Sequence, residues 1–332
     1  MTADPILTLA WLTLAHLVAD FVLQTAEMVA DKSSHGSRAW RGLLAHGIGV
    51  AVCLVPVVLA FGVPGLWVLV VVTASHVAID RGKVLLTRSA EARALADAHR
   101  RHEGRAPAAG LGRAWTPIPA TFFLLDQVAH LAVLALAWAI WLAGAVPTAT
   151  WASGVGGLLG GRDLAAIHDV VLAGVVIAGL LIANIRAGAL FVAILVRPFE
   201  AAKESGLTEE GPADPRRPYE AAAAPVAAPP TAAPPAPAAA PSPGPAPAPP
   251  ERNHVPTPAR VGATIGVLER LLIVTFLLAG ADAAIGFVLA AKTIARFRQL
   301  DDRDFAEYYL LGTLASVAVA IATGMLARAA LA

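Results

Sequence analysis

The sequence predicts an all-α integral membrane protein: a polytopic helical bundle of about seven transmembrane helices with a disordered Ala/Pro-rich tether. Hydrophobic residues make up 57% of the 332 residues and charged residues 15%, whereas soluble domains carry about 25% charged residues. Apolar stretches close to the roughly 20 residues needed to cross a bilayer recur along the chain. With a net charge of +1, we expect membrane lipid rather than nucleic acid as the partner.

Four regions follow from the order of these stretches. Residues 1–145 form an N-terminal four-helix membrane domain, and 146–199 hold a Gly-rich loop and a fifth helix. Residues 200–260 are a Pro/Ala-rich linker, because proline blocks regular structure and no apolar period is present. Residues 261–332 form a C-terminal membrane helix pair. The predicted spans are 6–23, 43–61, 65–79, 118–143, 170–196, 267–291 and 308–331.

Basic residues set the expected orientation. Eight of them lie between residues 81 and 113, after the third span, and three lie between 32 and 41, after the first. The positive-inside rule places both loops in the cytoplasm and the N-terminus outside. Seven spans would then put the basic residues of 292–303 outside, against the rule. Either the fifth span, which Asn184 and Arg186 interrupt, is not a simple span, or the rule is weak here.

Histidine and aspartate occur at a spacing of four residues in the first and fourth predicted spans and at the end of the third, and the second span holds a lone His46. On a helix this spacing puts both side chains on one face. Ionisable groups within membrane helices are costly and usually face the bundle interior, where they serve function. Because ends of odd helices and starts of even ones share a leaflet, all the groups fall at one depth, on the cytoplasmic side. The candidate site residues are His16, Asp20, His46, His76, Asp80, Asp126 and His130.

Imidazoles and carboxylates at one depth are typical of metal sites in helical bundles. Zn²⁺, Mn²⁺ and Fe²⁺ accept both donor types, and a bound ion would activate water. The leading hypothesis is metal-dependent chemistry, such as hydrolysis, on a lipid-like substrate at the cytoplasmic leaflet. A transporter or proton/ion relay that uses the same residues, and a non-catalytic scaffold locked by polar contacts, are the alternatives. No catalytic residue and no oligomeric state is assigned.

The motifs also resemble a known family. The pattern His16-x3-Asp20-Phe21-x2-Gln24, then His46, then His76-x3-Asp80, then Asp126-Gln127-x2-His130 is similar to the bacterial membrane proteins called domain of unknown function 3307, over roughly residues 6–143. The tail resembles longer members through Glu269-Arg270, Lys292-x3-Arg296-Phe297 and the stretch 306–313. The resemblance implies a multi-pass protein of the bacterial inner membrane and supplies no activity. The residue types are also loosely similar to membrane-bound metal-dependent hydrolases.

Overall fold

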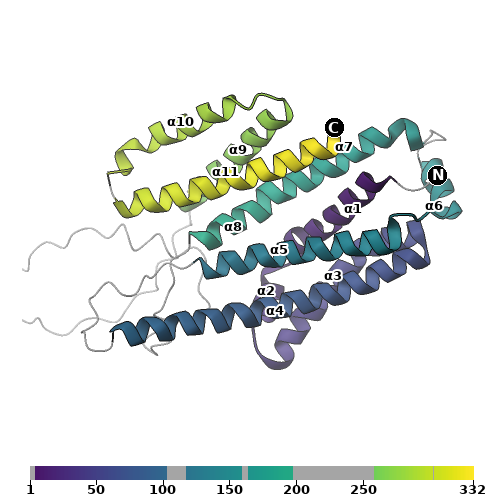
Figure 1. Cartoon of the computed structure of the whole chain (residues 1–332), viewed down its shortest axis with the longest axis horizontal. Helices are drawn as coiled ribbons and strands as arrows, with labels where there is room; N and C mark the ends of the chain where they lie inside the picture. Colours follow the sequence, from purple (N-terminus) through teal and green to yellow (C-terminus); the bar gives the residue numbers. More distant parts are fainter. Residues whose placement is uncertain (1–3, 103–116, 159–163, 197–257, 302) are drawn as a thin grey trace, which may run out of the picture.

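The computed structural model of the chain describes residues 4–102, 117–158, 164–196, 258–301 and 303–332. These residues form helices, with no strand among them. Six of the helices are long and apolar enough to cross a membrane, and the long helices run along one axis of the molecule (Figure 1). The structure confirms the all-α multi-pass class. Of the predicted tether, residues 200–260, the part up to residue 257 lies outside the described residues.

The N-terminal region is a four-helix bundle in which π-helical turns end two of the spans. Its apolar core joins residues such as Leu12, Leu54, Val68 and Leu134, one from each long helix. The first, second and fourth predicted spans therefore agree with the structure within a few residues. The elements are α1 Pro5–Val18, η1 Ala19–Leu23, α3 Gly36–Phe61, α4 Val63–His102, α5 Ile118–Ala137 and η2 Trp138–Leu142.

The third predicted span, 65–79, is much too short. Helix α4 runs for 40 residues without a break, so Asp80 and Lys83 lie inside a helix and not at its end. The helix continues because residues 84–102 contain neither glycine nor proline and include many strong helix formers. Lys83 was expected to reach toward the membrane surface, but it turns inward to Asp126 instead.

A short helix, α2 Ala26–Lys32, replaces part of the loop expected after the first span. Thr25 caps its N-terminus by accepting a hydrogen bond from Met28 N at 3.2 Å. The helix lies against α3 at Gly42, where an added Cβ would be only 2.6 Å from Lys32 N. This close approach carries Lys32 into the bundle, where the side chain is buried.

Beyond the four-helix bundle, the predicted Gly-rich loop contains a helix. α6 Ala149–Leu158 begins at Thr148, whose hydroxyl accepts a hydrogen bond from Trp151 N at 3.3 Å. The fifth span is then continuous despite Asn184 and Arg186, which lie in a π-helical turn within it. Its parts are α7 Leu164–Ile182, η3 Ala183–Ala187 and α8 Gly188–Leu195.

The sixth predicted span, 267–291, is wrong as a single helix. It divides into α9 Pro258–Leu278 and α10 Ala284–Arg296, which form a hairpin with Gly280 at a φ of 70° in the turn. Ala281 N donates to Phe276 O at 2.8 Å, so the turn satisfies a carbonyl at the end of α9. Hydropathy stays high across the turn, so the apolar run gave no sign of the break.

The last helix, α11 Arg303–Leu331, runs parallel to α9 and antiparallel to the fifth span. Arg270 on α9 donates to Ser316 at 3.0 Å, and Arg328 lies 3.7 Å from Asp282 at the turn. The hairpin therefore returns the chain to the end of the molecule where α8 stops and α11 starts, as Figure 1 shows. The basic residues of 292–298 lie toward that end, which removes the conflict with the positive-inside rule.

This topology predicts which positions an impermeant thiol reagent reaches in intact cells. In a Cys53→Ala background, Gly144→Cys should label, whereas Ser89→Cys and Gln299→Cys should be protected, because both lie on the basic, cytoplasmic side. Seven simple spans would instead expose Gln299→Cys together with Gly144→Cys. Labelling of both would contradict the hairpin arrangement.

The contact between α2 and α3 predicts a position-specific stability effect. Gly42→Ala should lower the thermal midpoint of the purified protein in detergent, because overpacking costs about 1–3 kcal/mol. Gly49→Ala on the same helix is the matched control, since an added Cβ there meets nothing within 4 Å. We expect the control to keep or raise the midpoint. Equal midpoints for the two variants would show that the α2 contact does not constrain the fold.

Candidate metal centre

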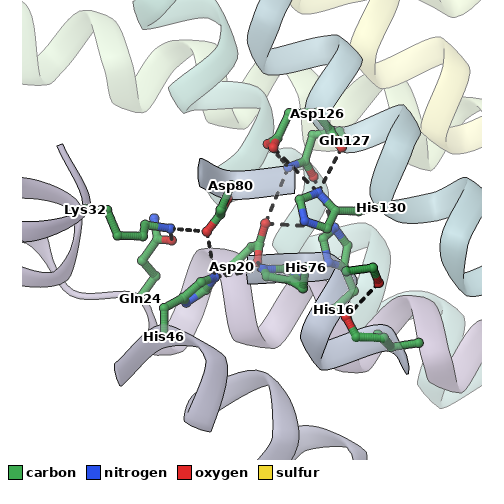
Figure 2. A network of polar contacts seen from close by, with 12 residues as sticks. His16, Asp20, Gln24, Lys32, His46, His76, Asp80, Asp126, Gln127 and His130 are labelled. Carbon is green, nitrogen blue, oxygen red and sulfur yellow. Dashed lines mark hydrogen bonds and ion pairs between the residues drawn. The ribbon is translucent and has the colours of Figure 1, made fainter. Parts of the chain in front are cut away.

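The structure brings all seven candidate side chains into one buried cluster inside the four-helix bundle (Figure 2). They come from five elements of the N-terminal region, so the polar faces of the four spans meet inside the bundle. α1 supplies His16, η1 supplies Asp20, α3 supplies His46, α4 supplies His76 and Asp80, and α5 supplies Asp126 and His130.

The centre of the cluster is a triangle of donor atoms. His46 Nε2 and His76 Nε2 lie 2.9 Å apart, and Asp20 Oδ1 lies 3.3 Å and 3.1 Å from them. Yet Asp20 Oδ1 is buried without a hydrogen-bond partner, so neither ring nitrogen is aligned with it. The two ring nitrogens are hydrogen-bonded to each other, so Asp20 Oδ1 is the atom of the triangle that no hydrogen bond satisfies.

The size of this triangle fits a small transition-metal ion. Bonds of roughly 2.0–2.1 Å to nitrogen and oxygen in a tetrahedral site hold the ligands about 3.3 Å from one another. Asp80 Oδ2, 3.6 Å from His46 Nε2, lies beside the triangle. Three overlapping sets of buried donors could hold an ion: His16–Asp20–His76, His46–His76–Asp80 and Asp80–Asp126–His130.

Two lysines complete the cluster, and the sequence interpretation did not assign them to it. Lys32 Nζ lies 2.6 Å from Asp80 Oδ2 and 2.5 Å from Gln24 Oε1. Lys83 Nζ lies 2.8 Å from Asp126 Oδ2. The spacing of Lys83 three residues after Asp80 was a usable signal. No sequence pattern linked Lys32 to the cluster, because the helix ends at Gln24, whose backbone is extended, and helical periodicity does not continue beyond it.

The charges of the cluster leave it one unit negative. Three carboxylates face two ammonium groups, and the imidazoles are neutral when they act as ligands. An isolated charge in an apolar interior is costly, so a buried site favours a compensating partner. A single divalent cation would change the net charge from −1 to +1, whereas two would make it +3. The charges therefore favour one ion.

Gln127 and His130 organise the side of the cluster on α5. Gln127 Nε2 lies 3.4 Å from Asp20 Oδ2, and its Oε1 lies 3.3 Å from His16 Nε2. His130 Nδ1 donates to Asp126 O at 2.8 Å, which fixes the tautomer and leaves Nε2 as an acceptor. That Nε2 is buried without a partner, and the His130 ring centroid lies 4.0 Å from that of His76.

Comparison with known proteins shows a family resemblance for this part of the chain. Neither the curated proteins nor the solved structures include a match. Residues 8–153, which contain every candidate ligand, match the family model described as a protein of unknown function, DUF3307. The match supports the resemblance to this family that the His/Asp motifs predicted.

Proposed function

We propose that the N-terminal bundle binds one divalent transition-metal ion, Zn²⁺, Mn²⁺ or Fe²⁺, through Asp20, His46 and His76. The observation that supports this is the triangle of donors 2.9–3.3 Å apart, with a buried carboxylate oxygen that lacks a hydrogen bond. Structural polar contacts between helices do not need this arrangement, since aligned hydrogen bonds would satisfy the same atoms. Asp80, whose Oδ2 lies 3.6 Å from His46 Nε2 and is paired with Lys32, would be the candidate for a fourth ligand.

Such an ion would suit metal-dependent hydrolysis of a lipid-like substrate at the cytoplasmic leaflet, because a bound divalent ion would supply a nucleophile by lowering the pKa of a water toward about 7. His130 Nε2, which is buried and has no hydrogen-bond partner, would be the group that accepts a proton in this site. Lys83, whose side chain is 29% exposed, links the cluster to the side of the bundle where anionic groups of a substrate arrive.

A proton relay is the second candidate, and the continuity of polar contacts favours it. Close contacts run from Lys83 through Asp126 and Gln127 to Asp20, and then through the histidines to Asp80 and Lys32. Such chains of titratable groups conduct protons in membrane proteins. Proton flux in vesicles that hold metal-free protein would distinguish the relay from the metal site.

Metal content tests the main proposal directly. Protein purified without a histidine tag should hold close to one transition-metal ion per chain by elemental analysis. Asp20→Asn and His46→Ala should each reduce retention by about 100-fold or more, because each removes a direct ligand. His35→Ala is the matched control: His35 is exposed and its side chain contacts Arg88, outside the cluster, so the metal content should not change.

The opposite result is equally clear. Metal-free wild type that also fails to bind added Zn²⁺, Mn²⁺ or Fe²⁺ would refute the metal proposal and leave the relay. Unchanged metal content in both Asp20→Asn and His46→Ala would show that the ion lies elsewhere in the chain.

The pH dependence of binding tests the identity of the ligands. A histidine ligand must be neutral to bind a metal ion. In the acidic range where both imidazoles are protonated, Kd should rise by about two log units per pH unit, because two imidazoles must each release a proton. Isothermal titration of Zn²⁺ between pH 5 and 7.5 measures this slope. A slope near zero would mean that carboxylates alone hold the ion.

A further inference from the structure

A second buried polar centre lies in the C-terminal helices, beyond the residues that match the family. Arg270 on α9 is 2% exposed, and it lies between Asn184 in η3 and Ser316 on α11, which are 0% and 5% exposed. These residues come from three helices and lie near the middle of each. Their hydrogen bonds run to one another and to neighbouring residues of these three helices, and not to the His/Asp cluster.

Neutral acceptors hold the guanidinium group in place. Arg270 Nε donates to the backbone carbonyl of Asn184 at 2.8 Å, and Nη1 donates to Ser316 Oγ at 3.0 Å. The carbonyl is available because the π-helical turn η3 changes the backbone hydrogen-bond pattern there. Both partners fix the orientation of Arg270, but neither supplies a negative charge.

No carboxylate among the described residues forms an ion pair with Arg270, although the charge of the adjacent Glu269 acts on it through space. Its neighbour Glu269 points to α10, where its carboxylate accepts a hydrogen bond from Lys292 Nζ at 2.5 Å. Arg270 Nη2 is buried and has no hydrogen-bond partner, and the same is true of Asn184 Oδ1. A buried charge without a partner is expensive, and in a membrane helix it marks a binding or transport function by default.

The guanidinium is packed less tightly at its Nη end than at its Nε edge. A Cβ built on Gly266, one turn before Arg270, would meet only Arg270 Nη1 within 4 Å among the described atoms, at 3.7 Å, which is ordinary van der Waals contact. A Cβ on Gly188 would lie much closer to its neighbours, 3.0 Å from Val319 Cγ1 and 3.3 Å from Arg270 Nε. The unsatisfied Nη2 therefore lies at the less tightly packed end of the guanidinium.

We propose that Arg270 is an anion-binding residue whose ligand is a carboxylate or phosphate group that bonds to Nη2. Arg binds such oxygens with charge-assisted hydrogen bonds, which are about twice as strong as neutral ones. The anion is either the acidic group of a membrane lipid or a small soluble anion, since both present the same oxygens. This site does not depend on the metal proposal and remains if the His/Asp cluster binds no ion.

Thermal unfolding of the full chain in an uncharged detergent tests the site. One arm adds sodium phosphate or sodium acetate against sodium chloride at equal ionic strength. The other arm adds phosphatidylglycerol against phosphatidylcholine. A ligand that binds only the folded state raises the midpoint, so the wild type should shift upward by roughly 4 °C in one arm. A shift with the salts assigns a soluble anion, and a shift only with phosphatidylglycerol assigns a lipid.

Three variants decide whether Arg270 is responsible. Arg270→Gln should lose the shift, whereas Arg328→Gln, which removes an exposed arginine of α11, should keep it. Ser316→Asp keeps Arg270 and places a carboxylate next to Nη1, so it should also lose the shift. If Arg270→Gln does not fold, the result with Ser316→Asp shows whether Arg270 binds the anion. No shift of the wild type in either arm, or a full shift in Ser316→Asp or Arg270→Gln, would overturn the proposal.

Discussion

The N-terminal fold depends on burying three carboxylates inside an apolar bundle. Asp20, Asp80 and Asp126 would each be costly in this environment if they were left alone. Polar partners offset this cost. Imidazoles from three spans surround Asp20, and the ammonium groups of two lysines pair with the other two carboxylates. The cluster is thus a strict constraint on helix register, because a shift of one residue on any span would leave a charge without a partner.

Satisfying Asp80 explains the most irregular part of the chain. The counter-charge is Lys32, which can enter the bundle only if the chain leaves the first span and turns back within a few residues. The π-helical turn η1, the extended residue Gln24 and the short helix α2 achieve this. Gly42 then allows the α2 backbone to lie directly on α3. Local backbone irregularity therefore follows from an electrostatic requirement.

The sequence could predict only those features that a local pattern within one helix reveals. Periodicity within a helix was enough to find His16 with Asp20 and His76 with Asp80, and to bring the four spans together. It could not find Lys32, which belongs to a different helix and pairs across 48 residues. It also missed the turn at Gly280, because a window average of hydropathy does not register a change of direction within an apolar segment. Predicting these features requires knowledge of the packing of other helices.

The two polar centres differ in the sign of charge that they lack, and this difference separates their chemistry. The π-helical turns η1 and η3 contact each other where the N-terminal bundle meets the fifth span. Even so, Arg270 does not neutralise the acidic cluster, because Asn184 O and Ser316 Oγ hold its guanidinium on the far side of η3. A cluster with an excess negative charge and a separate arginine with an excess positive charge therefore persist within one membrane protein. Among the described residues, the acidic cluster keeps one excess negative charge and Arg270 forms no ion pair, which is why we propose a cation for the first centre and an anion for the second.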